Sequence, residues 1–515
     1  MHLNMQFLLL LSIILNIINI SIGWHTFLRG RSRYGNLGEP ILSSTLHDLP
    51  EEQWFTQYLD HFNPSDARVW KQRYFVNTNF YKPNGPIFLL IGAEGIASAK
   101  WMIEGQWIEY AKEFGAMCFY VEHRFYGKSH PTSDLGTKNL KFLTSQQALA
   151  DLAYFIENVN IQHKFSNNTK WIVFGGSYGG SLAAWMRLKY PHLVHGAVSS
   201  SGPLLAQIDF QQYFVVVANA LKDYSQKCVD TLIETNKELN ILLHHTAGQQ
   251  LIKKKFKLCE QIDGHTKKLD ITNLYETLAE NFAGIVQYNK DNRKHSDTAN
   301  FTIETVCDIL IDEKKGIPID RLAYISNIIL YSTKEKCLDY SYSNMIRQLH
   351  DISWASEQAE GGRQWMYQTC TEFGFFQTST AEQNLFGNIP VNFSIQQCVD
   401  IFGPRYDRDL LETAVTRTNI LYGALDLQVT NVVFVHGSVD PWHVLGITAS
   451  SNPQAPAIYI QGTAHCADMY PSSENDMPQL KEARAQIKDL IQQWLKNSSC
   501  NIHTPSCDRY TSHVQ

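Results

Sequence analysis

Short runs of apolar and β-branched residues recur through roughly the first 200 residues, and each run ends in glycine or in a polar turn. The runs cover residues 86–91, 116–121, 171–174 and 194–198. Such runs, apolar throughout, are typical of strands buried on both faces of a parallel sheet. Between the second and third run, residues 145–162 carry apolar side chains at helical spacing. This alternation predicts an α/β fold with a doubly wound, mostly parallel sheet.

The strand pattern stops near residue 205 and returns late in the chain. Apolar runs resume at residues 432–435 and 457–460, and a helix is expected from Pro478. Between them the sequence is helix-rich and more polar. The economical interpretation is one interrupted sheet domain, with an independent helical domain as the alternative. In the interpretation with one sheet domain, that domain comprises residues 50–205 and 412–500. A helical cap insertion comprises residues 206–411, and a C-terminal tail comprises residues 501–515.

The first 23 residues contain no Asp, Glu, Lys or Arg, and residues 7–22 are apolar except for four positions. Sixteen residues is short of the roughly 20 that a membrane-spanning helix needs. We interpret residues 1–23 as a secretory signal peptide cut near Gly23, with a membrane anchor as the alternative. No later stretch reaches 18 uninterrupted apolar residues, so we expect no stable membrane insertion after signal cleavage.

Ten cysteines favour disulfide bonds formed in an oxidising compartment. Zinc is the competing interpretation, but the chain has no C-x-x-C pair and no histidine cluster at ligand spacing. We therefore predict no metal and no cofactor. Cys500 and Cys507 are close enough to close a small loop, and the other pairings stay open. Four glycosylation sequons agree with secretory passage, at Asn167, Asn300, Asn392 and Asn497.

Residues 175–179 form a G-x-S-x-G pattern around Ser177. A predicted strand precedes the pattern, and good helix formers follow it up to Pro191. This strand–turn–helix setting is typical of a nucleophile elbow, in which a strained turn exposes the serine hydroxyl. A glycine-rich turn with an incidental serine is the alternative. We predict that Ser177 is a nucleophile.

A serine nucleophile needs a histidine base and a carboxylate that orients the base. In elbow hydrolases these residues follow late strands in the order acid, then histidine. Asp440 follows the apolar run at 432–435, and His465 follows the run at 457–460. The loops after strand ends are where open α/β sheets build their sites. We prefer this pair over the competing residues Asp426, Asp468, His436 and His443.

The oxyanion formed in acyl transfer needs backbone N–H donors that are already in place. One predicted donor is the amide of Tyr178, directly after the nucleophile. The other is expected in the loop at residues 92–95, from Ala93 or Glu94. The Glu94 side chain either anchors this loop or meets a charged end of the substrate.

Several motifs resemble the family of lysosomal prolyl carboxypeptidase, dipeptidyl peptidase II and thymus-specific serine protease. The resemblance covers about residues 50–500. It is carried by residues 122–127 (EHRFYG), 175–185 (GGSYGGSLAAW), 189–192 (KYPH), 367–372 (YQTCTE), 440–442 (DPW) and 464–465 (AH). Within it, three stretches look most like the thymus-specific branch: 365–374 (WMYQTCTEFG), 440–445 (DPWHVL) and 465–469 (HCADM).

The resemblance implies an α/β-hydrolase with an inserted helical cap and a serine peptidase triad. It also implies that Trp442 and Ser181 lie near the pocket for the residue before the cleaved bond. The best-known members are exopeptidases that cleave after proline and are most active at acidic pH. This chain departs from the proline-selective branches at residues 443–445 and at Cys466, which weakens the transfer of a proline preference.

We therefore predict a secreted or lysosomal serine exopeptidase that acts on short peptides through an acyl-enzyme. An esterase or lipase on the same fold is one alternative, and a non-catalytic binding protein with a hydrolase fold is another. Carboxypeptidase and dipeptidyl peptidase action are not distinguished by the sequence. The expected partner is a peptide substrate, and a homodimer is left open. A formal net charge of −6 argues against a nucleic-acid partner.

Overall fold

A computed structural model gives the structure of most of the chain. It describes residues 27–42, 48–263, 265, 267–290, 301–380 and 385–496. The predicted signal peptide and the predicted tail lie outside these residues, as do the sequons at Asn300 and Asn497 and the close pair Cys500 and Cys507.

The centre of the molecule is a sheet with eight strands among the described residues, in the order β12-β11-β8-β7-β5-β6-β4-β3. Its strands are β3 (Gln53–Tyr58), β4 (Val69–Asn77), β5 (Ile87–Ile91), β6 (Met117–Val121), β7 (Trp171–Gly176), β8 (Gly196–Ser200), β11 (Val432–Gly437) and β12 (Ala457–Ile460). Pairing is parallel from β12 to β6, whereas β4 runs antiparallel to both of its neighbours. The sheet is therefore mostly parallel, as the apolar runs predict.

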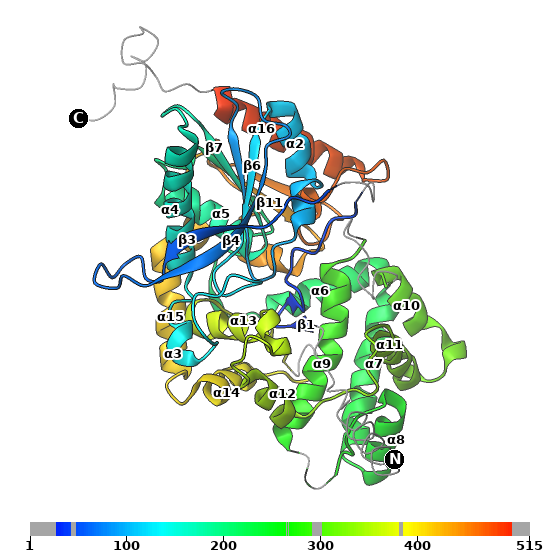
Figure 1. The fold of residues 1–515 in the computed structure, drawn as a ribbon. Helices are drawn as coiled ribbons and strands as arrows, with labels where there is room; N and C mark the ends of the chain where they lie inside the picture. The colour runs from blue at the N-terminus through cyan, green and yellow to red at the C-terminus, as the bar shows by residue number, and fades with distance from the viewer. Residues whose placement is uncertain are drawn as a thin grey trace, which may run out of the picture.

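Helices cover both faces of this sheet (Figure 1). They are α2 (Gln106–Phe114) and α16 (Pro478–Lys496) on one face, and α4 (Ser145–His163) and α5 (Tyr178–Lys189) on the other. Alternate side chains of β5 explain the two layers: Leu89 packs with the α4 and α5 side, and Phe88 packs with the α2 and α16 side. Because both faces of β5 are buried, its sequence is apolar throughout.

Between β8 and β11 the chain is mainly helical, and these helices gather below the sheet in Figure 1. They are α6 (Gln212–Tyr224), α7 (Gln226–Leu243), α8 (Thr246–Phe256), α9 (Lys268–Gln287), α10 (Ile303–Ile311), α11 (Pro318–Ser332), α12 (Tyr342–Leu349), α13 (Gly362–Gln368), α14 (Val391–Phe402) and α15 (Arg408–Tyr422). Two short strands, β9 (Gln207–Asp209) and β10 (Gly374–Phe376), pair in parallel beside them. The sequence pattern does not predict this small sheet.

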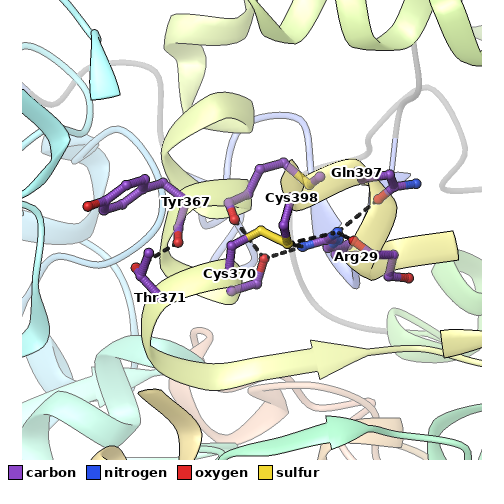
Figure 2. Close-up of a disulfide and its surroundings, with 9 residues drawn as sticks. Arg29, Tyr367, Cys370, Thr371, Gln397 and Cys398 are labelled. Atoms are coloured by element: carbon purple, nitrogen blue, oxygen red, sulfur yellow. Dashed lines mark hydrogen bonds between the residues drawn. A yellow bond between two sulfur atoms is a disulfide. The ribbon is translucent and has the colours of Figure 1, made fainter. Parts of the chain in front are cut away.

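Three disulfides lie in this helical part: Cys228–Cys307, Cys259–Cys337 and Cys370–Cys398. The third is drawn in Figure 2. Two further cysteines, Cys118 and Cys466, are buried and unpaired. The even cysteine count therefore predicts the presence of disulfides but not which cysteines form them.

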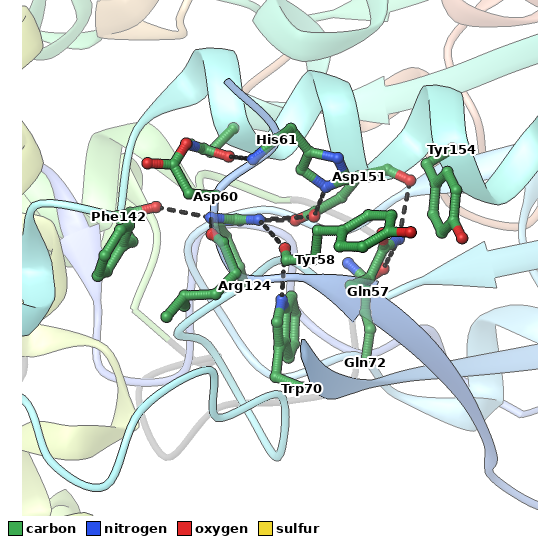
Figure 3. A network of polar contacts seen from close by, with 12 residues as sticks. Gln57, Tyr58, Asp60, His61, Trp70, Gln72, Arg124, Phe142, Asp151 and Tyr154 are labelled. Carbon is green, nitrogen blue, oxygen red and sulfur yellow. Dashed lines mark hydrogen bonds and ion pairs between the residues drawn. The ribbon is translucent and has the colours of Figure 1, made fainter. Parts of the chain in front are cut away.

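A buried ion network holds the loop after β6 against α4 (Figure 3). The Arg124 guanidinium donates to both carboxylate oxygens of Asp151, each at 2.6 Å. His61 Nε2 lies 2.7 Å from the same carboxylate. Arg124 belongs to the first of the family-like motifs, and this network gives that motif a structural role.

The N-terminal segment at residues 27–42, which we name the strap, runs between the sheet and the helical part. It begins with a short hairpin of β1 (Phe27–Leu28) and β2 (Arg31–Ser32). Figure 1 places β1 beside α13 and α9. The side chains of Arg29, Arg31 and Asn36 are all buried. This segment lies outside the predicted domains, and no periodic apolar pattern marks it in the sequence.

Within the described parts of the chain, every helix is too short or too polar to cross a membrane.

Candidate active site

Ser177 lies between β7 and α5 with a backbone of φ 58° and ψ −131°. Positive φ is strained for a residue with a side chain and is found where surrounding contacts enforce it. Here the Ser177 amide donates to the Ser200 carbonyl of the neighbouring strand at 2.9 Å. A Cβ at Gly175 would overlap the Gly179 carbonyl. The turn therefore requires glycine beside the serine, as in a nucleophile elbow.

Asp440 and His465 follow the ends of the two strands β11 and β12. His465 Nδ1 lies 2.9 Å from Asp440 Oδ2, and both side chains are fully buried. Asp440 Oδ1 accepts from the amide of Trp442 at 3.0 Å. The loops after two neighbouring strands thus bring together two residues that are 25 positions apart in the sequence.

The electrostatics of this pair favour its charged form. Burial lowers the pKa of His465, but the charge and hydrogen bond of Asp440 and the neighbouring Cys466 together outweigh burial and leave the pKa well above its ordinary value. Burial raises the pKa of Asp440, whereas the His465 charge and hydrogen bond lower it, with a net decrease. An imidazole held in this way is suited to accept a proton from a neighbouring group.

The serine and the histidine are not bonded to one another. Ser177 Oγ accepts a hydrogen bond from Asn36 Nδ2 at 3.2 Å. His465 Nε2 is buried and has no hydrogen-bond partner of normal geometry among the described residues. Asn36 Oδ1 accepts from the hydroxyl of Tyr288, at the end of α9, at 2.7 Å. Sequence reasoning missed Asn36 and Tyr288, since Gly-Asn pairs are ordinary turn residues and Tyr288 belongs to no motif.

The loop after β5 lies beside the serine and contacts the strap. Glu94 is 1% exposed, and its Oε1 accepts from the Asn36 amide at 3.0 Å. Its Oε2 has no partner among the described residues. Burial raises the pKa of this carboxyl. Ala93, the other predicted oxyanion residue of this loop, is partly buried, and Tyr178 begins α5, where helix N–H groups are free to bind an anion.

The two residues predicted near the pocket have different environments. Trp442 is buried among aromatic side chains, and its Nε1 donates to Gln287 Oε1 at 2.9 Å. Ser181 Oγ instead donates to the carbonyl of Pro203 at 2.7 Å, inside the fold. Ser181 thus anchors α5 to the chain that follows β8.

The competing acids and histidines have other contacts. Asp426 is exposed, and Asp468 accepts from Ser200 Oγ at 2.5 Å. His443 Nδ1 lies 2.7 Å from the Asp440 carbonyl oxygen. His436 is buried, and burial lowers its pKa to about 4. None of these four side chains forms the acid–histidine hydrogen bond that Asp440 and His465 form.

The sequons at Asn167 and Asn392 lie on exposed residues. Both side chains are therefore accessible to glycosylation.

The strand order, the antiparallel β4 and the serine elbow after β7 define an α/β-hydrolase. Comparison with known proteins narrows this class. Residues 57–487 match the family model described as Serine carboxypeptidase S28, and the chain belongs to this family. It is a serine peptidase of the S28 family.

Three relatives illustrate the range of the family. A Caenorhabditis elegans protein named as a serine protease is 38% identical over 91% of this chain and 93% of its own length. Mouse thymus-specific serine protease is 35% identical over 87% of this chain and 88% of its own. Bovine lysosomal Pro-X carboxypeptidase is 28% identical over 86% and 88%. The disulfides and the lysosomal relative fit the secretory pathway.

Proposed function

We propose that this peptidase cleaves short peptides as an exopeptidase, with Ser177 as nucleophile, His465 as base and Asp440 as the orienting acid. The observation that carries the proposal is the buried Asp440–His465 hydrogen bond of 2.9 Å, formed beside the strained Ser177 elbow. The elbow supplies a nucleophile and the pair supplies a base of raised pKa.

The reaction proceeds through an acyl-enzyme. Ser177 Oγ attacks the peptide carbonyl while His465 Nε2 takes the hydroxyl proton, and the imidazolium then gives that proton to the leaving amine. A water molecule, deprotonated by the same nitrogen, attacks the ester and releases the acid product. Asp440 holds the Nδ1–H tautomer and stabilises the imidazolium. The amides of Tyr178 and of Ala93 or Glu94 stabilise the oxyanion.

The predicted helical insertion at residues 206–411 acts as a cap that restricts the access of substrates to the serine. Two observations support this role: the His465 amide donates to the Gln287 carbonyl at 3.0 Å, and Tyr288 reaches Asn36 beside the serine. Both cap residues come from the end of α9. A covered site favours short peptides or chain ends over folded proteins.

The proposed location is the lysosome or the extracellular space, reached after removal of residues 1–23. The proposal includes a preference for proline before the cleaved bond. The ground for this preference is that one relative is named as a Pro-X carboxypeptidase. Trp442 is the side chain we propose for this pocket, since it lies among the aromatic residues Phe210, Tyr213 and Phe375.

The test is Ser177→Ala, measured with peptide substrates and a fluorophosphonate probe that labels activated serines. We expect an unchanged melting temperature, no labelling, and a loss of turnover by several orders of magnitude. Ser133→Ala, at an exposed serine, is the control and should leave labelling and turnover unchanged. Activity of Ser177→Ala close to wild type would refute the assignment.

Substrate class needs a second assay. Free and end-blocked aminoacyl-prolyl peptides, compared with short-chain esters, separate carboxypeptidase, dipeptidyl peptidase and esterase action through the products formed. Faster turnover of esters than of every peptide would replace the exopeptidase proposal with an esterase.

A further inference from the structure

The proposed catalytic centre is closed in this structure. Ser177 is 3% exposed and His465 is 1% exposed, and His465 Nε2 is buried without a hydrogen-bond partner among the described residues. A substrate carbonyl must reach both side chains for acyl transfer. Some part of the structure therefore has to leave before a peptide can bind.

The strap is the segment that contacts the nucleophile. Asn36 Oδ1 accepts from the Ser32 amide at 3.1 Å and from the Tyr288 hydroxyl at 2.7 Å. These two donors fix the orientation of the Asn36 amide, so that its Nδ2 points to Ser177 Oγ. The serine oxygen thus accepts from the strap, and His465 Nε2 of the proposed base accepts no hydrogen bond from the serine hydroxyl.

The strap also contacts the loop that we propose for oxyanion binding. Arg31 Nε donates to the Glu94 carbonyl at 2.7 Å, and the main-chain N–H of Asn36 donates to the Glu94 carboxylate. A further guanidinium hydrogen of Arg31 is donated to the Glu360 carbonyl at 2.6 Å, in the helical part. The strap therefore links the loop after β5 to the helical part beside the serine.

Next to the proposed pocket, the strap lies with its backbone against Trp442. A Cβ at Gly30 would overlap the indole ring, so only glycine allows this approach. The Gly30 carbonyl accepts from Gln287 Nε2 at 3.1 Å. Gln287 also accepts from the Trp442 indole. An extended peptide substrate also has main-chain carbonyls, and one of them could accept the same hydrogen bond from Gln287.

The neighbouring residue, Arg29, enters a buried pocket of the helical part (Figure 2). Its guanidinium donates to Thr369 Oγ1 at 2.5 Å, to the Ser394 carbonyl at 2.8 Å and to Gln397 Oε1 at 2.9 Å. It also lies 4.2 Å from the centre of the Phe376 ring. These acceptors and the aromatic face make a site suited to a guanidinium.

We propose that the strap is an internal inhibitor seated in the peptide-binding cleft, and that the Arg29 pocket is a subsite for an arginine side chain of a peptide ligand. The inference rests on the proposed function. The enzyme becomes active when the strap is displaced or cut away, and an extended peptide then takes its place. The alternative is that the strap is a permanent part of the fold, and the experiment decides between the two.

The first experiment places a recognition site for a specific protease after Ile41, an exposed residue of the strap. The cut protein is freed of the strap by gel filtration, with loss of the peptide checked by mass spectrometry. We expect fluorophosphonate labelling of Ser177 at least about tenfold faster than in the uncut protein, because only the open fraction reacts. The same site inserted after Lys315, an exposed residue between Cys259 and Cys337, is the control: this cut leaves the strap attached and should leave labelling unchanged.

The outcomes separate the two levels of the proposal. Equal labelling before and after removal of the strap overturns the inhibitor proposal and leaves the catalytic assignment standing. No labelling of either form refutes Ser177 as nucleophile. A strap whose removal abolishes the cooperative melting transition is part of the fold, and this result also overturns the proposal.

The second experiment tests the subsite with a synthetic peptide of residues 27–38 added to the strap-free enzyme. We expect the peptide to slow labelling, and Arg29→Ala in the peptide to weaken inhibition at least about tenfold. Arg33→Ala is the matched control: this arginine forms a partly exposed ion pair with Glu360, so its loss should change inhibition less than about threefold. Equal weakening by both substitutions would overturn the Arg29 subsite, and inhibition by a scrambled peptide would overturn the seated-ligand proposal.

Discussion

Replacing Asp440 by asparagine tests the proposed base most directly, and the structure contains an internal reference for the effect. His436 is as buried as His465 but has no carboxylate bonded to its ring, and burial lowers its pKa from 6.5 to about 4. His465 has a raised pKa because the charge and hydrogen bond of Asp440, together with the neighbouring Cys466, outweigh the same burial. In Asp440→Asn the largest of the influences that raise this pKa is lost.

The expected loss follows from this comparison. Losing the Asp440 charge lowers the pKa of His465 and destabilises the imidazolium that forms in the transition state. The amide also leaves the Nδ1–H tautomer unspecified, which brings the total to about 10³–10⁴ in kcat. The variant keeps the side-chain volume, so we expect it to fold.

The assay is kcat/KM against pH for wild type and variant in the same form of the protein, with fluorophosphonate labelling as a second readout. A base must be neutral to accept a proton, so the acid limb of the wild-type profile reports the raised pKa of His465, and in Asp440→Asn this limb moves to lower pH. Asp426→Asn, at an exposed aspartate, is the control and should match wild type. A loss below about tenfold, or an acid limb that does not move, would refute Asp440 as the partner of His465.

Three further predictions concern stability. Arg124→Ala leaves buried Asp151 without its guanidinium partner and should cost about 3–5 kcal/mol in urea unfolding. Arg68→Ala, at a fully exposed ion pair, should change stability much less, and equal losses would contradict the network. Replacing Cys370 and Cys398 by serine opens a loop of 28 residues and should cost about 3–4 kcal/mol, seen as a lower Tm. Burial raises the pKa of Asp468 from 3.8 to about 6, so the unfolded state loses its proton first and stability falls by about 2 kcal/mol as pH rises from 4 to 6. Unfolding of Asp468→Asn should lack this slope, and an unchanged slope would disprove the cause.

Local sequence pattern predicts much of the sheet because burial on both faces makes the central strands apolar throughout. β5 and β7 begin within one residue of the predicted runs. The run at 194–198 is displaced from β8, which ends in serines whose backbone pairs with β7 and β11. The apolar runs do not predict the antiparallel strands β3 and β4, because both strands mix buried and exposed residues, and only β3 forms the edge of the sheet.

Some residues of the site are likewise marked by local sequence pattern, and others are not. Ser177, Asp440 and His465 are each marked by a strand end, and an elbow sequence marks the first. Asn36 and Tyr288 reach the site through contacts across 141 and 252 positions of the chain. No local periodicity encodes such contacts, and a strap held as a ligand has no reason to show the pattern of a strand or helix.

Gln287 connects the strap to the proposed triad and suggests why opening the cleft need not disturb it. This fully buried residue donates to the Gly30 carbonyl and accepts from the Trp442 indole, and its own carbonyl accepts from the His465 amide. The Tyr213 hydroxyl also donates to it, at 2.7 Å. Loss of the strap removes only the bond to Gly30, so three contacts still hold Gln287 and, through it, the backbone of His465. The freed Nε2 of Gln287 then faces the cleft as a donor for a substrate carbonyl. Gln287→Glu should therefore weaken peptide binding and raise KM more than it lowers kcat, and the opposite split would show that this residue acts mainly through His465.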